Sequence, residues 1–156
     1  DFETVIREIA DIGVYYAEWQ VLNTKQFLPQ NRERVFIIGR HIRNGCPEAI
    51  FPFGEGSGVP TRKNDECKWL SENGEGIAYS LDAHFYKGVA NQSRTMIACQ
   101  KKIRRLTPVE CERLQGFKDG WTEGISDTQR YGCLGNAVSV PVVREIGSRL
   151  LEAVCK

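Results

Sequence analysis

The stretch LPQNRERVFIIGR, residues 28–40, places one amide and two guanidinium side chains at alternate positions: Gln30, Arg32 and Arg34. They lead into the apolar run 35–38, which is typical of a buried strand. Because alternate side chains of a strand share one face, the pattern predicts that these three groups project in a row. Guanidinium groups stay charged and make paired, directed hydrogen bonds. The same pattern also fits a salt-bridged edge strand, and both interpretations remain open at this point.

Two later segments carry helix-start and turn signals. RRLTPVECERLQGF, residues 104–117, has Thr107 as a hydroxyl cap, Pro108 at the first helical position and Glu110 three residues after the cap. Each of these serves the unpaired N–H groups of a helix start, so a short helix is expected there. DTQRYGCLGNAVSVPVV, residues 127–143, contains a turn that feeds another helix and can present N–H groups to a carboxylate. Taken singly, each segment also fits ordinary capping and loop chemistry.

The remaining signals predict an α/β fold. Apolar residues at helical spacing indicate a helix over 2–12, and a last helix is expected to begin around 139–141. Residues 44–103 are loop-rich, with weak strand signals only. Helix, strand, turn and strand in this order are typical of one edge of an α/β sheet. Strands are expected at 15–22 and 35–40, and weaker ones at 77–82 and 94–99.

The composition is that of a globular protein. The chain has 156 residues, of which 41% are hydrophobic and 26% charged, and no apolar run approaches the roughly 20 residues of a membrane span. It begins Asp-Phe-Glu-Thr, without the basic and apolar segments of a signal peptide. Its six scattered cysteines form no C-x-x-C motif, so we expect reduced thiols in a cytoplasmic protein and no metal site.

The net charge of +1 indicates no particular partner, but local clusters of cations do. Four cations lie within residues 101–105, and four arginines lie within 32–43. Basic clusters of this kind suit phosphate backbones. A solvated surface is an equally common alternative for any one cluster.

The segments 29–39, 104–117 and 127–143 have the order and spacing of the last three conserved blocks, motifs VIII to X, of DNA (cytosine-5) methyltransferases. The sequence closely resembles that family over about 100 of its 156 residues. The resemblance implies an α/β fold: the C-terminal edge of a Rossmann-like, S-adenosylmethionine-dependent methyltransferase sheet plus a small loop-rich target recognition domain. It implies three parts: 1–43 from the catalytic domain, 44–103 as the target recognition region, and 104–156 as the return segment whose C-terminal helix packs back on the catalytic domain.

The resemblance also assigns roles to the opening residues. Enzymes that methylate a base in duplex DNA rotate the target nucleotide out of the stack. By the family pattern, Arg34 would hydrogen-bond the O2 atom of the flipped cytosine, Arg32 would hold nearby polar groups or backbone, and Gln30 would order the start of the strand. These three are the candidate catalytic residues. Asn136 and Ala137 match positions that line the S-adenosylmethionine pocket of the family.

The region 44–103 would supply the sequence readout of double-stranded DNA. In the family, loops of this region enter the major groove, where each base pair shows a distinct hydrogen-bonding pattern. The segment HFYKGVANQSR, 84–94, is favoured because it is dense in long polar side chains, although plain solvation is the alternative for any single loop residue. The candidate DNA-binding residues are Arg62, Lys63, His84, Tyr86, Lys87, Asn91, Gln92, Arg94, Lys101 and Lys102.

Three catalytic motifs of the family do not occur in this sequence: the Pro-Cys nucleophile, the Glu-Asn-Val glutamate and the F-x-G-x-G cofactor loop. We therefore expect the C-terminal part of a methyltransferase, whose missing N-terminal catalytic half lies in the same or in a separate chain. Alone, this chain is expected to be inactive. The alternative function is that of a catalytically inactive DNA-recognition subunit of a split enzyme. The expected setting is a bacterial or phage-encoded restriction–modification system, cytoplasmic and associated with the nucleoid.

Overall fold

The computed structural model describes residues 1–41, 49–53, 67–70, 77–87, 95–99 and 102–154. Contacts within the chain divide it into two compact units, which are described separately. The first unit comprises Asp1–Leu22, Glu33–Glu55 and Arg144–Lys156. The second comprises Asn23–Arg32 and Gly56–Val143.

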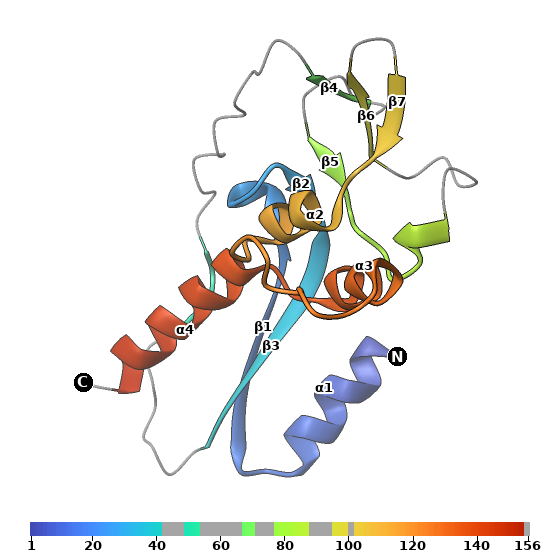
Figure 1. Ribbon diagram of the computed structural model, residues 1–156. Helices are drawn as coiled ribbons and strands as arrows, with labels where there is room; N and C mark the ends of the chain where they lie inside the picture. Colours follow the sequence, from blue (N-terminus) through green and yellow to red (C-terminus); the bar gives the residue numbers. More distant parts are fainter. Residues whose placement is uncertain (42–48, 54–66, 71–76, 88–94, 100–101, 155–156) are drawn as a thin grey trace. The chain divides into compact units, whose positions relative to one another are not determined.

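The first unit is built on two paired strands, β1 (Tyr15–Asn23) and β3 (Glu33–His41) (Figure 1). The amphipathic helix α1 (Phe2–Asp11) precedes them, and the Asp1 side chain caps it by accepting a hydrogen bond from the Thr4 N–H at 3.0 Å. The C-terminal part of helix α4 (Val140–Val154) completes the unit. Several apolar side chains of its strands are exposed: Tyr15, Trp19, Val21, Val35 and Ile37.

A buried ion pair between Arg40 of β3 and Glu18 of β1 stabilises this unit. Glu18 also accepts hydrogen bonds from the N–H groups of Ile50 and Phe51, at 2.8 and 3.2 Å. Arg149 of α4 donates to the Ile50 carbonyl at 3.1 Å. The segment 49–53 is therefore held from two sides, by a strand and by a helix.

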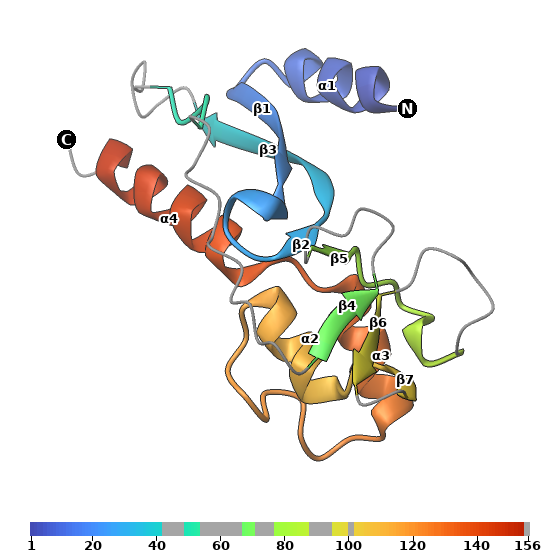
Figure 2. The ribbon, with the colours of Figure 1, turned by 90° about the horizontal axis from the view of Figure 1, so that it is seen from above.

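The second unit contains a three-stranded antiparallel sheet in the order β4 (Cys67–Leu70), β6 (Met96–Cys99) and β7 (Lys102–Arg105). Strand β2 (Gln30–Asn31) pairs in parallel with β5 (Ala78–Tyr79). The single-turn helices η1 (Thr24–Gln26) and η3 (Phe85–Lys87) lie in the connections. Helices α2 (Pro108–Gln115) and α3 (Asp127–Asn136) lie side by side (Figures 1 and 2).

One apolar cluster holds the elements of the second unit together. Its members come from β5, η3, β6, α2, α3 and the segments between them, so residues far apart in the sequence share one core. The Tyr131 hydroxyl, inside this core, donates to the Leu106 carbonyl at 2.8 Å. The buried members are Ala78, Leu81, Phe85, Ile97, Leu106, Cys111, Leu114, Tyr131 and Leu134.

Most of the predicted elements are confirmed: α1, β1, β3, α2 and α4 start and end close to their expected limits, and β5 and β6 lie within the weak strand signals. Helix α3 was not predicted, because Gly132 and Gly135 in its interior lower its intrinsic helix propensity. The prediction of one strand that carries Gln30, Arg32 and Arg34 in a row is wrong. Gln30 belongs to β2, Arg32 lies between β2 and β3, and only Arg34 is in β3.

The two compact units do not follow the predicted segments 1–43, 44–103 and 104–156. Residues 49–53 pack in the first unit through Glu18 and Arg149, as described above. The functions assigned to the three segments remain predictions. Within the described ranges, no helix is long and apolar enough to cross a membrane.

Candidate functional site

The guanidinium of Arg32 is the centre of a buried polar site in the second unit, and only 5% of Arg32 is exposed. Its Nη1 atom donates to the Ser80 hydroxyl at 3.0 Å and to the Leu81 carbonyl at 2.7 Å. Its Nη2 atom donates to the carbonyls of Gly135 and Ala137 at 3.0 and 2.9 Å. One side chain thus joins the segment after β5 to the end of α3.

The turn between α3 and α4, residues 135–139, is also held through Ser139. The Ser139 hydroxyl donates to the Gln115 side-chain oxygen at 3.0 Å and lies 3.0 Å from the Thr24 hydroxyl. Gln115 in turn donates to the Leu134 carbonyl at 3.2 Å. All of these side chains are buried, so the network is shielded from water and its hydrogen bonds are strengthened.

The two predicted cofactor-binding residues lie in this turn. Asn136 is exposed and ends α3, and Ala137 is half-buried and extended, with φ −66° and ψ 159°. The helix α4 begins shortly after, at Val140, and a helix N-terminus presents backbone N–H groups without intrahelical partners. The turn therefore combines an exposed amide side chain with a helix that starts four residues later.

Gln30 and Arg34, the other two candidate catalytic residues, lie in contrasting surroundings. Gln30 is fully buried, and neither side-chain atom of its amide has a hydrogen-bond partner among the described residues. Arg34 is exposed in β3 and donates to the Glu33 carbonyl at 2.6 Å. Arg34 belongs to the first compact unit, whereas Gln30 and Arg32 belong to the second.

Glycine is required at position 135, because two segments of the backbone approach each other closely there. A Cβ atom at this position would lie 2.2 Å from the carbonyl carbon and oxygen of Asp82 and 2.4 Å from the Ala83 nitrogen. Because backbone atoms cannot move aside cheaply, Gly135→Ala should lower the free energy of unfolding by about 1–3 kcal/mol.

The matched control for this prediction is Gly147→Ala. Gly147 lies inside α4 with no atom within 4 Å of the added Cβ, so alanine should raise the free energy of unfolding by about 0.5–1 kcal/mol. Urea unfolding followed by circular dichroism measures both variants. Equal effects at the two positions would contradict the close approach at Gly135.

The helix start predicted at Thr107 is confirmed as a full capping box. The Thr107 hydroxyl accepts from the Glu110 N–H, and the Glu110 carboxylate accepts from the Thr107 N–H at 2.7 Å. Arg104 donates to both oxygens of Glu110 at 2.8 Å. Burial raises the pKa of the Glu110 carboxyl, but these hydrogen bonds outweigh it and lower the pKa. Helix α2 ends at Gly116, in the left-handed conformation with φ 80°.

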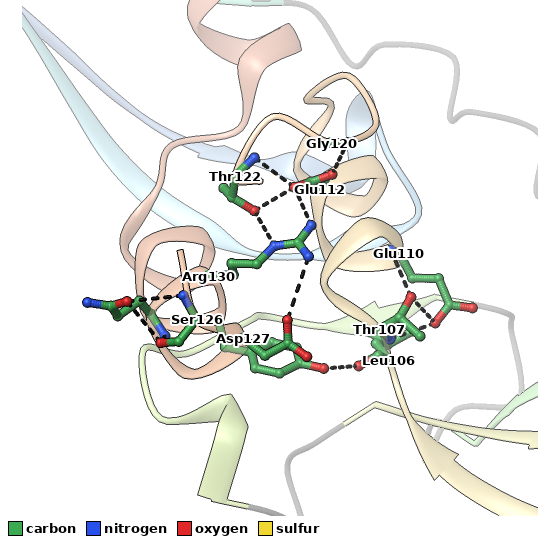
Figure 3. Close-up of polar contacts among 11 residues, drawn as sticks. Leu106, Thr107, Glu110, Glu112, Gly120, Thr122, Ser126, Asp127 and Arg130 are labelled. Atoms are coloured by element: carbon green, nitrogen blue, oxygen red, sulfur yellow. Dashed lines mark hydrogen bonds and ion pairs between the residues drawn. The ribbon is translucent and has the colours of Figure 1, made fainter. Parts of the chain in front are cut away.

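A second buried ion pair, Glu112–Arg130, joins α2 to α3 and to the loop between them (Figure 3). The Glu112 carboxylate accepts from the Gly120 N–H at 2.7 Å, from the N–H and hydroxyl of Thr122 at 2.9 and 2.5 Å, and from Arg130 at 3.1 Å. Burial raises the pKa of Glu112, but these four donors outweigh it and lower the pKa to about 2. Both oxygens of a fully buried carboxylate therefore accept hydrogen bonds.

Two of the ten predicted DNA-binding residues, Tyr86 and Lys87, lie in η3, and a third, His84, directly precedes it. His84 and Lys87 are exposed, and the ammonium of Lys87 lies 5.9 Å from the centre of the Tyr86 ring. The Tyr86 carbonyl accepts from Arg105 at 2.9 Å. Lys102 is in β7. The other six, Arg62, Lys63, Asn91, Gln92, Arg94 and Lys101, lie outside the described residues.

The cysteine of α2 offers no nucleophile. Cys111 is fully buried, and burial raises the pKa of its thiol to about 12, so the thiol stays protonated at neutral pH. Within the described residues, no group of three or more His, Cys, Asp or Glu side chains could hold a metal ion.

Sequence reasoning missed Glu112, Arg130, Thr24 and Ser139 as members of buried polar networks. Each is a common type of polar residue, and the hydrogen bonds that join it to its network span 8 to 115 positions. The only local signal was the placement of Glu112 among the apolar positions Cys111 and Leu114 of α2.

The comparisons with known proteins agree with these motifs. The family model of C-5 cytosine-specific DNA methylases matches residues 1–80 and 61–152. Type II methyltransferase M.HpaII of Haemophilus parainfluenzae is 27% identical, over 95% of this chain and 53% of that protein. Type II methyltransferase M.NlaX of Neisseria lactamica is 31% identical, over 97% of this chain and 57% of that protein. The chain thus spans about half the length of these relatives.

Solved structures resemble the fold. The crystal structure of S. pombe Dnmt2 methyltransferase matches with a TM-score of 0.70 and 20% identity, over 97% of this chain and 62% of that one. The Entamoeba histolytica methyltransferase EhMeth matches with a TM-score of 0.64 and 17% identity, over 97% and 57%. The fold is thus α/β, of the Rossmann-like methyltransferase type. By its family model, the chain belongs to the C-5 cytosine-specific DNA methylases.

Proposed function

We propose that this chain is the C-terminal part of an enzyme that transfers a methyl group from S-adenosylmethionine to C5 of a cytosine flipped out of duplex DNA. One observation carries the proposal: two family motifs meet at one side chain. Arg32 of the Q-x-R-x-R motif donates to Gly135 and Ala137 of the G-N-A-V turn, 103 and 105 positions away. A salt-bridged edge strand would not require this link between distant motifs.

Arg34 is the residue that we assign to the flipped cytosine. Its guanidinium is exposed and donates to the adjacent Glu33 carbonyl, so it can turn toward a base. A hydrogen bond from Arg34 to O2 of the cytosine would hold the base. It would also withdraw electron density from the ring, which favours nucleophilic attack. One contact would therefore serve both binding and chemistry.

The turn at Asn136 and Ala137 is the part of this chain that we assign to the cofactor. S-adenosylmethionine, when bound, supplies an activated methyl group. The exposed Asn136 amide and the N–H groups at the start of α4 would bind its polar end, and the fixed turn would orient it. The residues present therefore fit the cofactor that the family implies.

DNA recognition would use η3 and the loops of 44–103. His84 and Lys87 are exposed on a turn that the buried Phe85 anchors in the core, which is a rigid base for groove contacts. Arg104 and Arg105 would contribute less to DNA binding than their charges indicate. Arg104 is paired with Glu110, and Arg105 is held by the Tyr86 carbonyl and lies 5.2 Å from the centre of the Tyr131 ring.

The N-terminal catalytic half would cover the exposed apolar positions of β1 and β3. Trp19, Val21 and Val35 are each about half exposed, which is unusual for the strands of an α/β sheet. The relatives have about as much chain again as this one has. We place the complete enzyme in the bacterial cytoplasm, at nucleoid DNA.

Methyl transfer from labelled cofactor to cytosine-containing duplex tests the proposal. This chain alone should show none, because covalent attack on the base needs an activated thiolate that its sequence does not supply. The complete enzyme, as one polypeptide or as two mixed chains, should transfer the label. Transfer by this chain alone would contradict its assignment as an inactive part. Duplex binding without transfer by the complete enzyme would favour the inactive recognition subunit.

A further inference from the structure

Helix α3 ends without the residue that usually closes a helix. Asn136 is its last residue, and Ala137 follows in an extended rather than a left-handed conformation. The last carbonyls of a helix have no intrahelical partner and carry partial negative charge. Here a buried guanidinium caps the C-terminal end of α3. Arg32 Nη2 donates to the Gly135 carbonyl at 3.0 Å and to the Ala137 carbonyl at 2.9 Å.

These two carbonyls lie on either side of Asn136. Fixing both of them fixes the peptide plane that leads into Asn136 and the plane that follows Ala137, so the backbone is held on both sides and the Cα–Cβ bond of the exposed Asn136 has a defined direction. Glycine at 135, with its wide conformational freedom, would not define that direction by itself.

The other terminal nitrogen of the Arg32 guanidinium holds the segment 80–83. Nη1 donates to Ser80 and Leu81, and the next residues, Asp82 and Ala83, approach Gly135 so closely that a Cβ would not fit. The turn is therefore held against the segment 80–83 by a bridge of charged hydrogen bonds and by direct backbone contact. Only the first of these depends on a side chain.

We propose that Arg32 is the positioning residue of the cofactor turn, and that it holds Asn136 in its binding orientation by capping α3 against the segment 80–83. This inference rests on the proposed function, and it differs from a role for Arg32 at the cytosine. A residue that orders the cofactor turn should affect cofactor affinity. A residue that binds the base should affect the rate of the chemical step at saturating cofactor.

The first test is hydrogen–deuterium exchange on this chain, without cofactor. Arg32→Met keeps an unbranched, largely apolar side chain but removes the guanidinium and its four hydrogen bonds. Amides of 136–140 and 80–83 should then exchange at least tenfold faster than in the wild type. Arg32→Lys, which keeps the charge but not the fork, should give an intermediate increase.

The matched control is Arg130→Met. Arg130 is also a largely buried arginine of the same compact unit, but it contacts Glu112, Thr122 and Asp127. The Arg130→Met substitution should increase exchange in the loop 117–126. It should leave the amides of 136–140 at the wild-type rate after correction for global stability. Equal exchange of 136–140 in the Arg32→Met and Arg130→Met variants would overturn the proposal. If Arg32→Met does not fold, Arg32→Lys against Arg130→Lys decides.

The second test uses the complete enzyme and S-adenosylmethionine. Arg32→Met should raise Kd and KM for the cofactor roughly 10- to 100-fold, the loss expected for charged hydrogen bonds, with kcat at saturating cofactor within about threefold. A fall in kcat with unchanged cofactor affinity would overturn the proposal. If the wild-type enzyme bound no cofactor, the proposed function itself would fail. Exchange at 136–140 would then still decide whether Arg32 orders the turn.

Discussion

Arg34→Ala in the complete enzyme should slow single-turnover methylation by about 30- to 1000-fold and leave duplex affinity almost unchanged. The reason is that its proposed partner is the flipped base, whereas most protein–DNA affinity comes from phosphate contacts elsewhere. A charged hydrogen bond to a buried partner contributes about 2–4 kcal/mol, which corresponds to that range of rates. Single-turnover methylation and a gel-shift titration on the same duplex measure the two quantities.

Two variants control this prediction. Arg34→Lys should recover only part of the rate, because an ammonium group cannot reproduce the directed fork of a guanidinium. Arg7→Ala removes another exposed arginine of the same compact unit, whose partner is Glu3 on α1, and it should leave the rate unchanged. Equally mild effects of Arg34→Ala and Arg7→Ala would show that Arg34 does not touch the base.

Arg40 is unsuitable as a control, although its sequence position resembles that of Arg34. It is buried and paired with the largely buried Glu18, so Arg40→Ala would leave an unpaired carboxylate inside the first unit. Its loss of activity would come from unfolding. Two arginines of one strand, six positions apart, thus differ in their surroundings, because Arg40 is buried and paired with Glu18 whereas Arg34 is exposed.

The sequence predicted best what depends on neighbouring residues. The capping box at Thr107 and Glu110 and the helical spacing of α1 are local patterns, and both are confirmed. The alternation of Gln30, Arg32 and Arg34 is also local, but its interpretation as one strand is wrong. Strand β2 pairs with β5, 48 positions further on, and that pairing ends at Asn31. No local pattern shows where a strand changes its partner.

The hydrogen-bond partners of the polar side chains could not be predicted, because they depend on contacts between distant segments. Arg32 reaches acceptors 48 to 105 positions away, and the Thr24 hydroxyl meets Ser139 115 positions away. The family resemblance predicted Arg32 and Asn136 as site residues but did not indicate that Arg32 contacts the residues on either side of Asn136. Gly135 and Glu112 carry equally strong constraints, but these arise from close packing in the folded chain.

The largest expected loss of stability is at Glu112. Glu112→Gln should lower the free energy of unfolding by about 3–5 kcal/mol, because it leaves the buried Arg130 without its best partner. For a chain of this size, that corresponds to a fall in Tm of roughly 6–20 °C. The loop that Glu112 holds through Gly120 and Thr122 should lose its order first. Differential scanning calorimetry of the isolated chain measures the effect, with the exposed Glu152→Gln as the matched control.

The pH dependence separates a charge effect from a packing effect. The pKa of Glu112 is lowered from its ordinary value of 4.5 to about 2, so the folded state binds fewer protons than the unfolded state between these values. The stabilisation by Glu112 is therefore complete above about pH 4.5 and is lost as the pH falls toward 2. Because glutamine does not titrate, the difference in stability between the wild type and Glu112→Gln should be constant from pH 7 to 5 and shrink by pH 3. A stability difference that stays constant down to pH 3 would mean that the glutamine amide destabilises the variant because it fits the site poorly. The charge of the Glu112 carboxylate would then contribute little.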